Sequence, residues 1–480
     1  MLNTPGRIVT ALALACLAGC GGEKEDLDAG IDIGADVPGE VAGEVPGDLP
    51  GDAPTEAQDQ APDFQQEIPA SERSLAIEEL PESAKSGSLL TLTVRARDDA
   101  NQSIQGATIN ALVTRGGGQL PVATATTGVD GLATFQWTLG PAPVRQTVSL
   151  DWNGVLATAT LDGVLDTPLA PAVFGNVAGF LASQAIEGST EDLAFSPDGT
   201  RMILGVPGGL LEVDSKGDVT TMALTGDTVG WPLGIAYDTD ANLWVADANG
   251  KAARRIDPAG NVTTVQIGTP AIELKYPNDL TTAAGGLIVM ADSCLGKVLV
   301  FRADGTLVSE AGFDAASEGG ANGVAVDPSG TALWVTTENT ALLCMDGSDM
   351  SARNGGLYKF ALGSDGTLGE RTDVAPGFAS YADGVTFDAE GNLYMMVDQV
   401  DTSLGLVESA VWILPAGGGE LRRFLSTTDK AMANAAFGPT AFGEQKLYMA
   451  LIAIPVLVDP EQRGVVAIDV GIKGHPLIPK

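Results

Sequence analysis

The stretch Asp383-Gly-Val-Thr-Phe-Asp-Ala-Glu-Gly-Asn-Leu-Tyr394 decides the fold, because its opening recurs along the chain. Related openings begin at five further positions: Glu191, Leu233, Asn278, Asn322 and Asn434. From one opening to the next, the steps are 42, 45, 44, 61 and 51 residues. Each opening strand meets a turn and an apolar second strand, and a third strand follows in several. Repeated antiparallel strands at this period are typical of propeller blades, so an all-β fold with a six-bladed β-propeller over residues 166–480 is predicted.

A separate β-sandwich is predicted before the propeller, over residues 73–165. Leu90, Leu92 and Val94 alternate with polar residues, as expected for half-buried strands, and turn signals separate several such stretches. The segment Thr126-Thr-Gly-Val-Asp-Gly-Leu-Ala-Thr-Phe-Gln-Trp-Thr-Leu-Gly140 resembles bacterial immunoglobulin-like domains of the invasin/intimin type. That resemblance implies a stalk or a binding unit, and nothing in the segment indicates catalysis.

The first 20 residues have the pattern of an export signal. Arg7 precedes an apolar run from Ile8 to Ala18, which is too short to cross a bilayer as a helix. The run closes with Leu17-Ala-Gly-Cys20, which resembles the bacterial lipobox. The resemblance implies that Cys20 is lipidated and that the chain is anchored to the cell envelope, in the outer membrane, on its periplasmic or its outer face. An ordinary secretory signal with a chance cysteine is the alternative.

Residues 21–72 are predicted to be a disordered acidic linker. Acidic residues recur every four positions, but proline and glycine in most repeats exclude a helix. Like charges with almost no bases extend such a segment, so a spacer is favoured over weak capture of cations. The formal net charge of the whole chain, −36, argues against nucleic acid as a partner.

The cysteines and the single histidine limit the chemistry that is available. After Cys16 and Cys20, only Cys294 and Cys344 remain, and two thiols in an exported protein are a candidate disulfide. Both follow the second strand of adjacent predicted blades, which makes the pairing geometrically reasonable. His475 is the only histidine, so a histidine-based metal site is excluded and this side chain is interpreted as a surface residue.

The residues that open the blades are the candidate functional residues. The first strand of each blade lines the central channel, so these carboxylates and amides should form a ring at one end of it. Oxygen ligands of this kind suit Ca²⁺, Mg²⁺ or Mn²⁺. Asn and Asp at such positions also hydrogen-bond tight turns, and from spacing alone both interpretations stay open.

The openings at Asn322 and Asp383 and the closing segment Asp469-Val-Gly-Ile-Lys-Gly-His-Pro476 resemble the regucalcin/gluconolactonase propellers. That resemblance implies that Glu191, Asn322 and Asp383 bind one divalent cation. Ca²⁺ is the expected ion, with Mg²⁺, Mn²⁺ or Zn²⁺ as alternatives. Asp383 would also be the general base, and Asn278 would lie at the substrate.

The chain departs from the pattern of that family at three positions. Asp192 replaces a glycine, Tyr276 replaces a sugar-binding arginine at the substrate, and Thr337 stands where an aspartate is expected, with Glu338 beside it. The resemblance implies a monomeric, metal-dependent hydrolase of a small lactone or related ester, and the three departures argue against gluconolactone itself as the substrate. A non-catalytic propeller that binds a ligand or partner is the alternative, so whether the chain is an enzyme stays open. Loops over residues 337–356, 397–409 and 452–464 are expected to narrow the channel mouth.

Overall fold

The computed structural model describes residues 73–186, 190–345, 349, 352–400, 406–452 and 463–476. Cys20, the predicted export signal and the predicted acidic linker lie outside these residues. The predicted limits between domains, after residues 20, 72 and 165, stay predictions. Among the described residues, no helix is long and apolar enough to cross a membrane.

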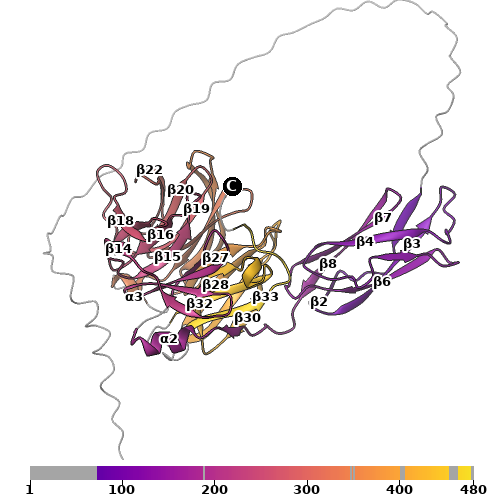
Figure 1. Ribbon diagram of the computed structural model, residues 1–480. Helices are drawn as coiled ribbons and strands as arrows, with labels where there is room; N and C mark the ends of the chain where they lie inside the picture. The colour runs from indigo at the N-terminus through magenta and orange to yellow at the C-terminus, as the bar shows by residue number, and fades with distance from the viewer. Residues whose placement is uncertain are drawn as a thin grey trace, which may run out of the picture. The chain divides into compact units, whose positions relative to one another are not determined.

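The first part of the described chain is a sandwich of two β-sheets (Figure 1). One sheet has the order β1 (Ser74–Ile77), β3 (Leu89–Arg97), β6 (Leu132–Thr138). The other has the order β2 (Ser83–Lys85), β8 (Val155–Val164), β7 (Arg145–Trp152), β4 (Thr108–Arg115), β5 (Thr124–Thr126). Alternate residues of β3 and β6, among them Leu92, Val94 and Phe135, are buried between the sheets. The period-2 pattern therefore places one face of each strand in the core.

Six blades follow, each with four antiparallel strands. The inner strands, in chain order, are β10 (Leu193–Phe195), β15 (Pro232–Tyr237), β19 (Pro277–Ala283), β23 (Gly320–Val326), β27 (Tyr381–Phe387) and β31 (Ala431–Phe437). The second strands are β11 (Arg201–Val206), β16 (Leu243–Asp247), β20 (Leu287–Asp292), β24 (Ala332–Glu338), β28 (Leu393–Val400) and β32 (Lys446–Ile452). Consecutive inner strands contact one another, and β31 contacts β10. The ring of six blades is therefore closed, as predicted.

The third and fourth strands complete the blades. They are β12 (Gly209–Asp214) with β13 (Val219–Thr221), β17 (Ala252–Ile256) with β18 (Asn261–Val265), β21 (Lys297–Arg302) with β22 (Leu307–Gly312), β25 (Gly355–Leu362) with β26 (Leu368–Ala379), and β29 (Leu406–Leu414) with β30 (Arg422–Thr427). β14 (Thr225–Gly226) adds to the outside of blade 2. In blade 6 the third strand is β33 (Gly464–Asp469), and the fourth is β9 (Ala172–Phe174), which precedes blade 1 in the chain. The ring is thus closed by pairing between distant parts of the propeller.

Apolar side chains between blades hold the ring together. Trp244 and Phe301 pack in one cluster between blades 2 and 3, and Tyr394 and Phe437 pack in another between blades 5 and 6. The helices α2 (Val177–Ser183), α3 (Ala341–Cys344) and the 3-10 helix η1 (Thr440–Phe442) are short. The regular secondary structure of the described residues is therefore almost entirely β.

In blades 1, 2, 4 and 5, an aspartate shortly after the inner strand is a turn residue. Asp388 accepts hydrogen bonds from the backbone N–H groups of Glu390 and Asn392, at 3.0 and 2.9 Å, and from the hydroxyl of Tyr394 at 2.9 Å. Asp238 makes the corresponding bonds in blade 2. These carboxylates cap the hairpin between first and second strands, which explains the recurring Asp and Asn without a catalytic role.

Candidate functional site

A β-bulge places the opening residues of the blades. The register between inner and second strands shifts between Ala321 and Val324 and between Ala382 and Val385. Asn322 and Asp383 lie inside these bulges, as Asn278 does in blade 3. A bulge re-aims the side chains of its unpaired residues. The recurring motif therefore marks the point where side chains leave the ladder of each inner strand.

The register corrects one prediction. In blade 6 the shift lies between Met432 and Ala435, so the equivalent of Asp383 is Ala433. Asn434 corresponds instead to Gly384, and a Cβ on Gly384 would collide with the Asn434 amide oxygen. The sixth member of the predicted ring is thus one residue off. Aligning the motifs by sequence does not reveal this shift, because Asn434 occupies the next position along the bulge.

The glycine of the motif allows neighbouring inner strands to approach closely. A Cβ on Gly323 would lie 2.5 Å from the carbonyl oxygen of Asp383 and 2.9 Å from Cα of Gly384. A Cβ on Gly234 would lie 2.5 Å from Cα of Asp279. Such distances leave no room for a side chain, so the glycines keep the channel narrow at the level of the opening residues.

The three predicted cation ligands are buried and short of hydrogen-bond partners. Glu191, Asn322 and Asp383 are 7 %, 1 % and 7 % exposed. Glu191 Oε2 and both amide atoms of Asn322 have no hydrogen-bond partner. Leaving such atoms unpaired in the interior costs about 1–3 kcal/mol each, so a group that they bind is expected.

Mutual repulsion accompanies this burial. Burial raises the pKa of the Glu191 carboxyl well above its ordinary range, and the charges of Glu338, Asp398 and Asp279 raise it further. Burial also raises the pKa of Asp383, followed by the effects of Glu191, Glu338, Asp398 and Asp279. These carboxylates therefore share one field of negative charge.

Glu338 and Asp398 belong to the same group, although the sequence analysis did not assign them to it. Glu338 Oε1 accepts hydrogen bonds from Asn278 Nδ2 and Ser293 Oγ, both at 2.8 Å. Asp398 Oδ1 is buried without a partner. Burial raises the pKa of each of these two carboxyls to about 7. The signal that could have found them is their place at the ends of second strands, 16 and 15 residues after Asn322 and Asp383.

The predicted substrate residues are engaged within the protein. The Asn278 side-chain amide donates to Glu338 and, at 3.0 Å, to Ser293 Oγ. Tyr276 is partly buried, and its backbone N–H donates to Asp292 at 2.9 Å. Their contact with a substrate stays a prediction.

Asp192 and Asp279 form a second layer of carboxylates in the channel. Asp192 accepts the backbone N–H groups of Leu193 and Ile235, both at 2.7 Å. Asp279 does the same with Leu280 and Val324, at 2.7 and 2.8 Å. Each carboxylate thus joins its own blade to the next one, so these side chains are primarily structural.

The donor set fits a hard divalent cation. None of the ion pairs found within the described ranges involves Glu191, Asp192, Asp279, Glu338, Asp383 or Asp398. The described residues contain no group of three or more His, Cys, Asp or Glu side chains arranged around a metal. The predicted set has only two such residues and an amide. Its oxygen donors, unpaired atoms and excess negative charge nevertheless favour Ca²⁺ or a similar ion.

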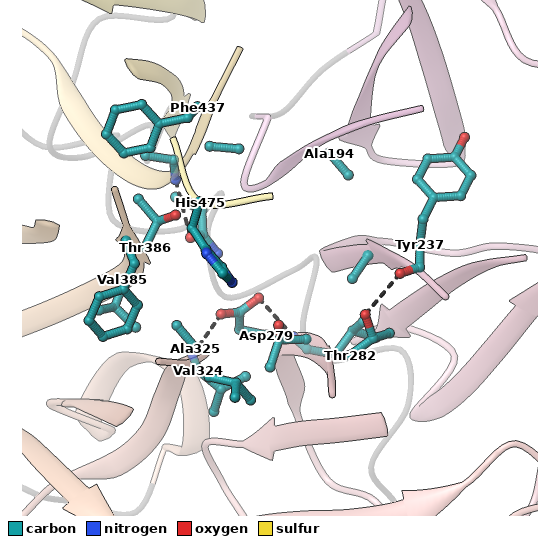
Figure 2. Close-up of a pocket in the computed structure, with 18 of the residues that line it drawn as sticks. Ala194, Tyr237, Asp279, Thr282, Val324, Ala325, Val385, Thr386, Phe437 and His475 are labelled. Carbon is teal, nitrogen blue, oxygen red and sulfur yellow. Dashed lines mark hydrogen bonds between the residues drawn. The ribbon is translucent and has the colours of Figure 1, made fainter. Parts of the chain in front are cut away.

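A cavity of about 460 Å³ lies at the other end of the inner strands (Figure 2). Its lining includes Asp279, Thr282, Phe437 and His475. Figure 2 shows His475 pointing into this cavity toward Asp279; the side chain is partly exposed, so it is a surface residue that lines a cavity. Burial lowers the pKa of the imidazole. Glu191, Asn322 and Asp383 do not line this cavity, so it is distinct from the predicted cation site.

A disulfide and an extended hairpin follow or lengthen the second strands of blades 3 to 5. Cys294 and Cys344 form a disulfide, with their Cα atoms 5.4 Å apart, and link the loops after β20 and β24. Of the three expected insertions, residues 397–409 largely extend β28 and β29, which pair as far as Val400 with Leu406. Parts of the other two lie outside the described residues, so the narrowing of the mouth stays a prediction.

Comparison with known proteins points to the propellers that the motifs indicate. No protein-family profile matches the chain. A gluconolactonase from Zymomonas mobilis is 24 % identical over 181 residues, which are 34 % of this chain and 48 % of that protein. The chain thus spans about half the length of this curated relative. It is similar to gluconolactonase.

Solved structures of similar fold include two bacterial proteins. A gluconolactonase from Xanthomonas campestris has 19 % identity and a TM-score of 0.43, with 60 % of this chain and 97 % of that one covered. Regucalcin from Agrobacterium tumefaciens, a calcium-binding protein, has 16 % identity and a TM-score of 0.46, with 65 % and 98 % covered.

Proposed function

We propose that the chain is a divalent-cation-dependent hydrolase of a lactone or a related ester. One observation carries the proposal: Glu191 and Asn322 bury oxygen atoms without partners, and the charge of Glu191 acts on the buried carboxyl of Asp383. Buried anionic oxygens of this kind favour binding of a cation. The similarity to gluconolactonase supports lactones as the substrate class.

Glu191, Asn322 and Asp383 would hold the cation, which, when bound, polarises a carbonyl group and makes a bound water more acidic. Asp383 would accept the proton of the attacking water, because its carboxylate lies among the ligands and has no basic partner among the described ion pairs. Burial of all three side chains excludes bulk water from their carboxylate and amide oxygens. The narrow glycine-lined channel supports a small substrate rather than a polymer.

Two further parts of the proposal concern location. The lipobox-like segment ending at Cys20 supports a lipid anchor, and the acidic residues 21–72 support a spacer between anchor and folded part. The sandwich would then present the propeller at the cell envelope, as immunoglobulin-like modules do. Labelling with a radioactive fatty acid in a bacterial host, in the parent and in Cys20→Ser, tests the anchor.

Calorimetric titration with Ca²⁺, Mg²⁺ and Mn²⁺, followed by a screen of small lactones with and without chelator, tests the central activity. We expect one tight site and hydrolysis that chelation abolishes. A chain that binds a cation but hydrolyses no ester would support the alternative, a propeller that binds a ligand without catalysis. A chain that binds no divalent cation would contradict the proposal.

A further inference from the structure

Three side chains form a row across blades 4 and 5. Glu338, at the end of β24, pairs directly with Tyr381 at the start of β27, and Tyr381 pairs directly with Asp398 on β28. Residues that lie opposite each other on antiparallel strands project from the same face. Glu338, Tyr381 and Asp398 therefore stand side by side, with Tyr381 on the middle strand.

This row has unused hydrogen-bonding capacity. Glu338 and Asp398 are each 5 % exposed, whereas Tyr381 is partly exposed. Asp398 Oδ1 and the Tyr381 hydroxyl are buried without a partner. Burial raises the pKa of the phenol, and the charges of Glu338 and Asp398 raise it further. The phenol thus lies in the field of both carboxylates and stays protonated.

A single divalent cation does not neutralise this region. Two positive charges on a cation held by Glu191, Asn322 and Asp383 balance two carboxylates only. The cation then does not balance Glu338 and Asp398, and no ion pair within the described ranges reaches either of them. Burial raises the pKa of both carboxyls to about 7, so either a proton or a positively charged group beside them would remove the cost of their buried charge.

We propose that Glu338, Tyr381 and Asp398 form a subsite for a positively charged ammonium group on the substrate. The inference rests on the proposed function and names the substrate class: a lactone or ester with a cationic substituent. Two carboxylates attract an ammonium group by charge, and the ring of Tyr381 adds an electron-rich face, as in other ammonium sites. Tyr276 stands where the family resemblance implies a sugar-binding arginine, so that position carries no positive charge to repel an ammonium group.

The binding test uses the full chain loaded with Ca²⁺, at constant ionic strength. The probes are butylammonium and its uncharged analogue 1-butanol, titrated by calorimetry. The parent should bind butylammonium at least about 10-fold more tightly than butanol, a difference of about 1.4 kcal/mol. Glu338→Gln and Asp398→Asn should each reduce this preference several-fold. Glu310→Gln, which removes an exposed carboxylate on β22, is the matched control and should keep it.

The kinetic test compares acetylcholine with its uncharged carbon analogue, 3,3-dimethylbutyl acetate. The parent should have a kcat/KM at least about 10-fold higher for the charged ester, mainly through KM, and Asp398→Asn should bring the ratio close to one. Tyr381→Phe keeps the ring, so it should keep most of the preference, and Tyr381→Leu should lose part of it.

Three results would overturn the inference. The first is equal affinity of the parent for butylammonium and butanol. The second is binding of two Ca²⁺ ions per chain, with the second lost in Asp398→Asn, which would make the row a metal site. The third is an unchanged preference for butylammonium over butanol in Glu338→Gln and Asp398→Asn, when the thermal unfolding of these variants matches that of the parent. If butylammonium binds as expected but no ester is hydrolysed, the cationic subsite holds while the proposed hydrolase fails.

Discussion

Replacing Gly323 by alanine tests the claim that glycine holds the inner strands at the spacing which the cation site needs. The added Cβ would lie 2.5 Å from the carbonyl oxygen of Asp383 and 2.6 Å from Thr336 Oγ1. Thr336 Oγ1 itself donates to that carbonyl and accepts the N–H of Gly323 at 2.7 Å. The methyl group therefore pushes on the peptide that carries Asp383 and on the hydroxyl that positions it.

The expected magnitude follows from two opposing effects. Overpacking typically costs about 1–3 kcal/mol, and the smaller backbone freedom of alanine in the unfolded chain returns about 0.4–1 kcal/mol. A net loss of about 1–2 kcal/mol is expected in the free energy of unfolding. Displacement of Asp383 should in addition weaken cation binding by about 10-fold, since roughly 1.4 kcal/mol corresponds to that factor.

Thermal unfolding in chelator and calorimetric titration with Ca²⁺ measure the two effects separately. Gly209→Ala is the matched control, because a Cβ there meets nothing within 4 Å. If Gly323→Ala matched Gly209→Ala in both measurements, the close approach of the inner strands would not matter for the site and the reasoning would be refuted.

Three further predictions concern charge, covalent structure and the second cavity. Burial raises the pKa of Asp279 to about 7, so the folded chain holds this proton between about pH 4 and 7 where the unfolded chain has lost it. The stability of the cation-free chain should thus fall as the pH rises through this window, so the melting temperature should be at least about 2 °C lower at pH 8 than at pH 6. Ca²⁺ should reduce this difference. A higher melting temperature at pH 8 would contradict the prediction. Titration of the unfolded, unreduced chain should find no reactive thiol at Cys294 or Cys344, and free thiols there would contradict the pairing. Changing both residues to serine should lower the free energy of unfolding by about 2–4 kcal/mol. His475→Ala should leave the Ca²⁺ affinity within about 2-fold of the parent, because this side chain lies in the separate cavity. A loss of about 10-fold, which corresponds to about 1.4 kcal/mol, would show that the cavity and the cation site are coupled.

Much of the fold could be predicted from the sequence, because the repeated motif marks the inner strand of most blades. The turn at Asp388 recurs at Asp238, with Asn242 and Trp244 as partners, so the positions of these hairpins could be inferred. The strand that closes the ring could not, since β9 is three residues long and pairs with β33 from the far end of the chain. Short strands that depend on a distant partner leave no periodic signal.

The candidate site was predicted less completely. Asn322 and Asp383 occupy equivalent positions in their bulges, as their shared motif indicated. Asn434 was placed one position off, because a sequence motif does not show where a bulge begins. Glu338 and Asp398 were not assigned to the site, because each stands alone at the end of an apolar strand and only cross-strand pairing with Tyr381 joins them. Strand register decides which side chains of neighbouring strands come together, and register depends on tertiary structure.

Calorimetric titration of Ca²⁺ into the parent and Asp383→Asn, alongside lactone hydrolysis by both, tests the central claim most directly. The substitution keeps the shape and one oxygen ligand while removing the charge and the proton acceptor. The parent should bind one cation and hydrolyse a small lactone, and the variant should stay folded, bind the cation more weakly and lose at least about 10²-fold in activity, the scale expected for a general base. A variant that binds Ca²⁺ and hydrolyses the lactone as well as the parent does would contradict the account.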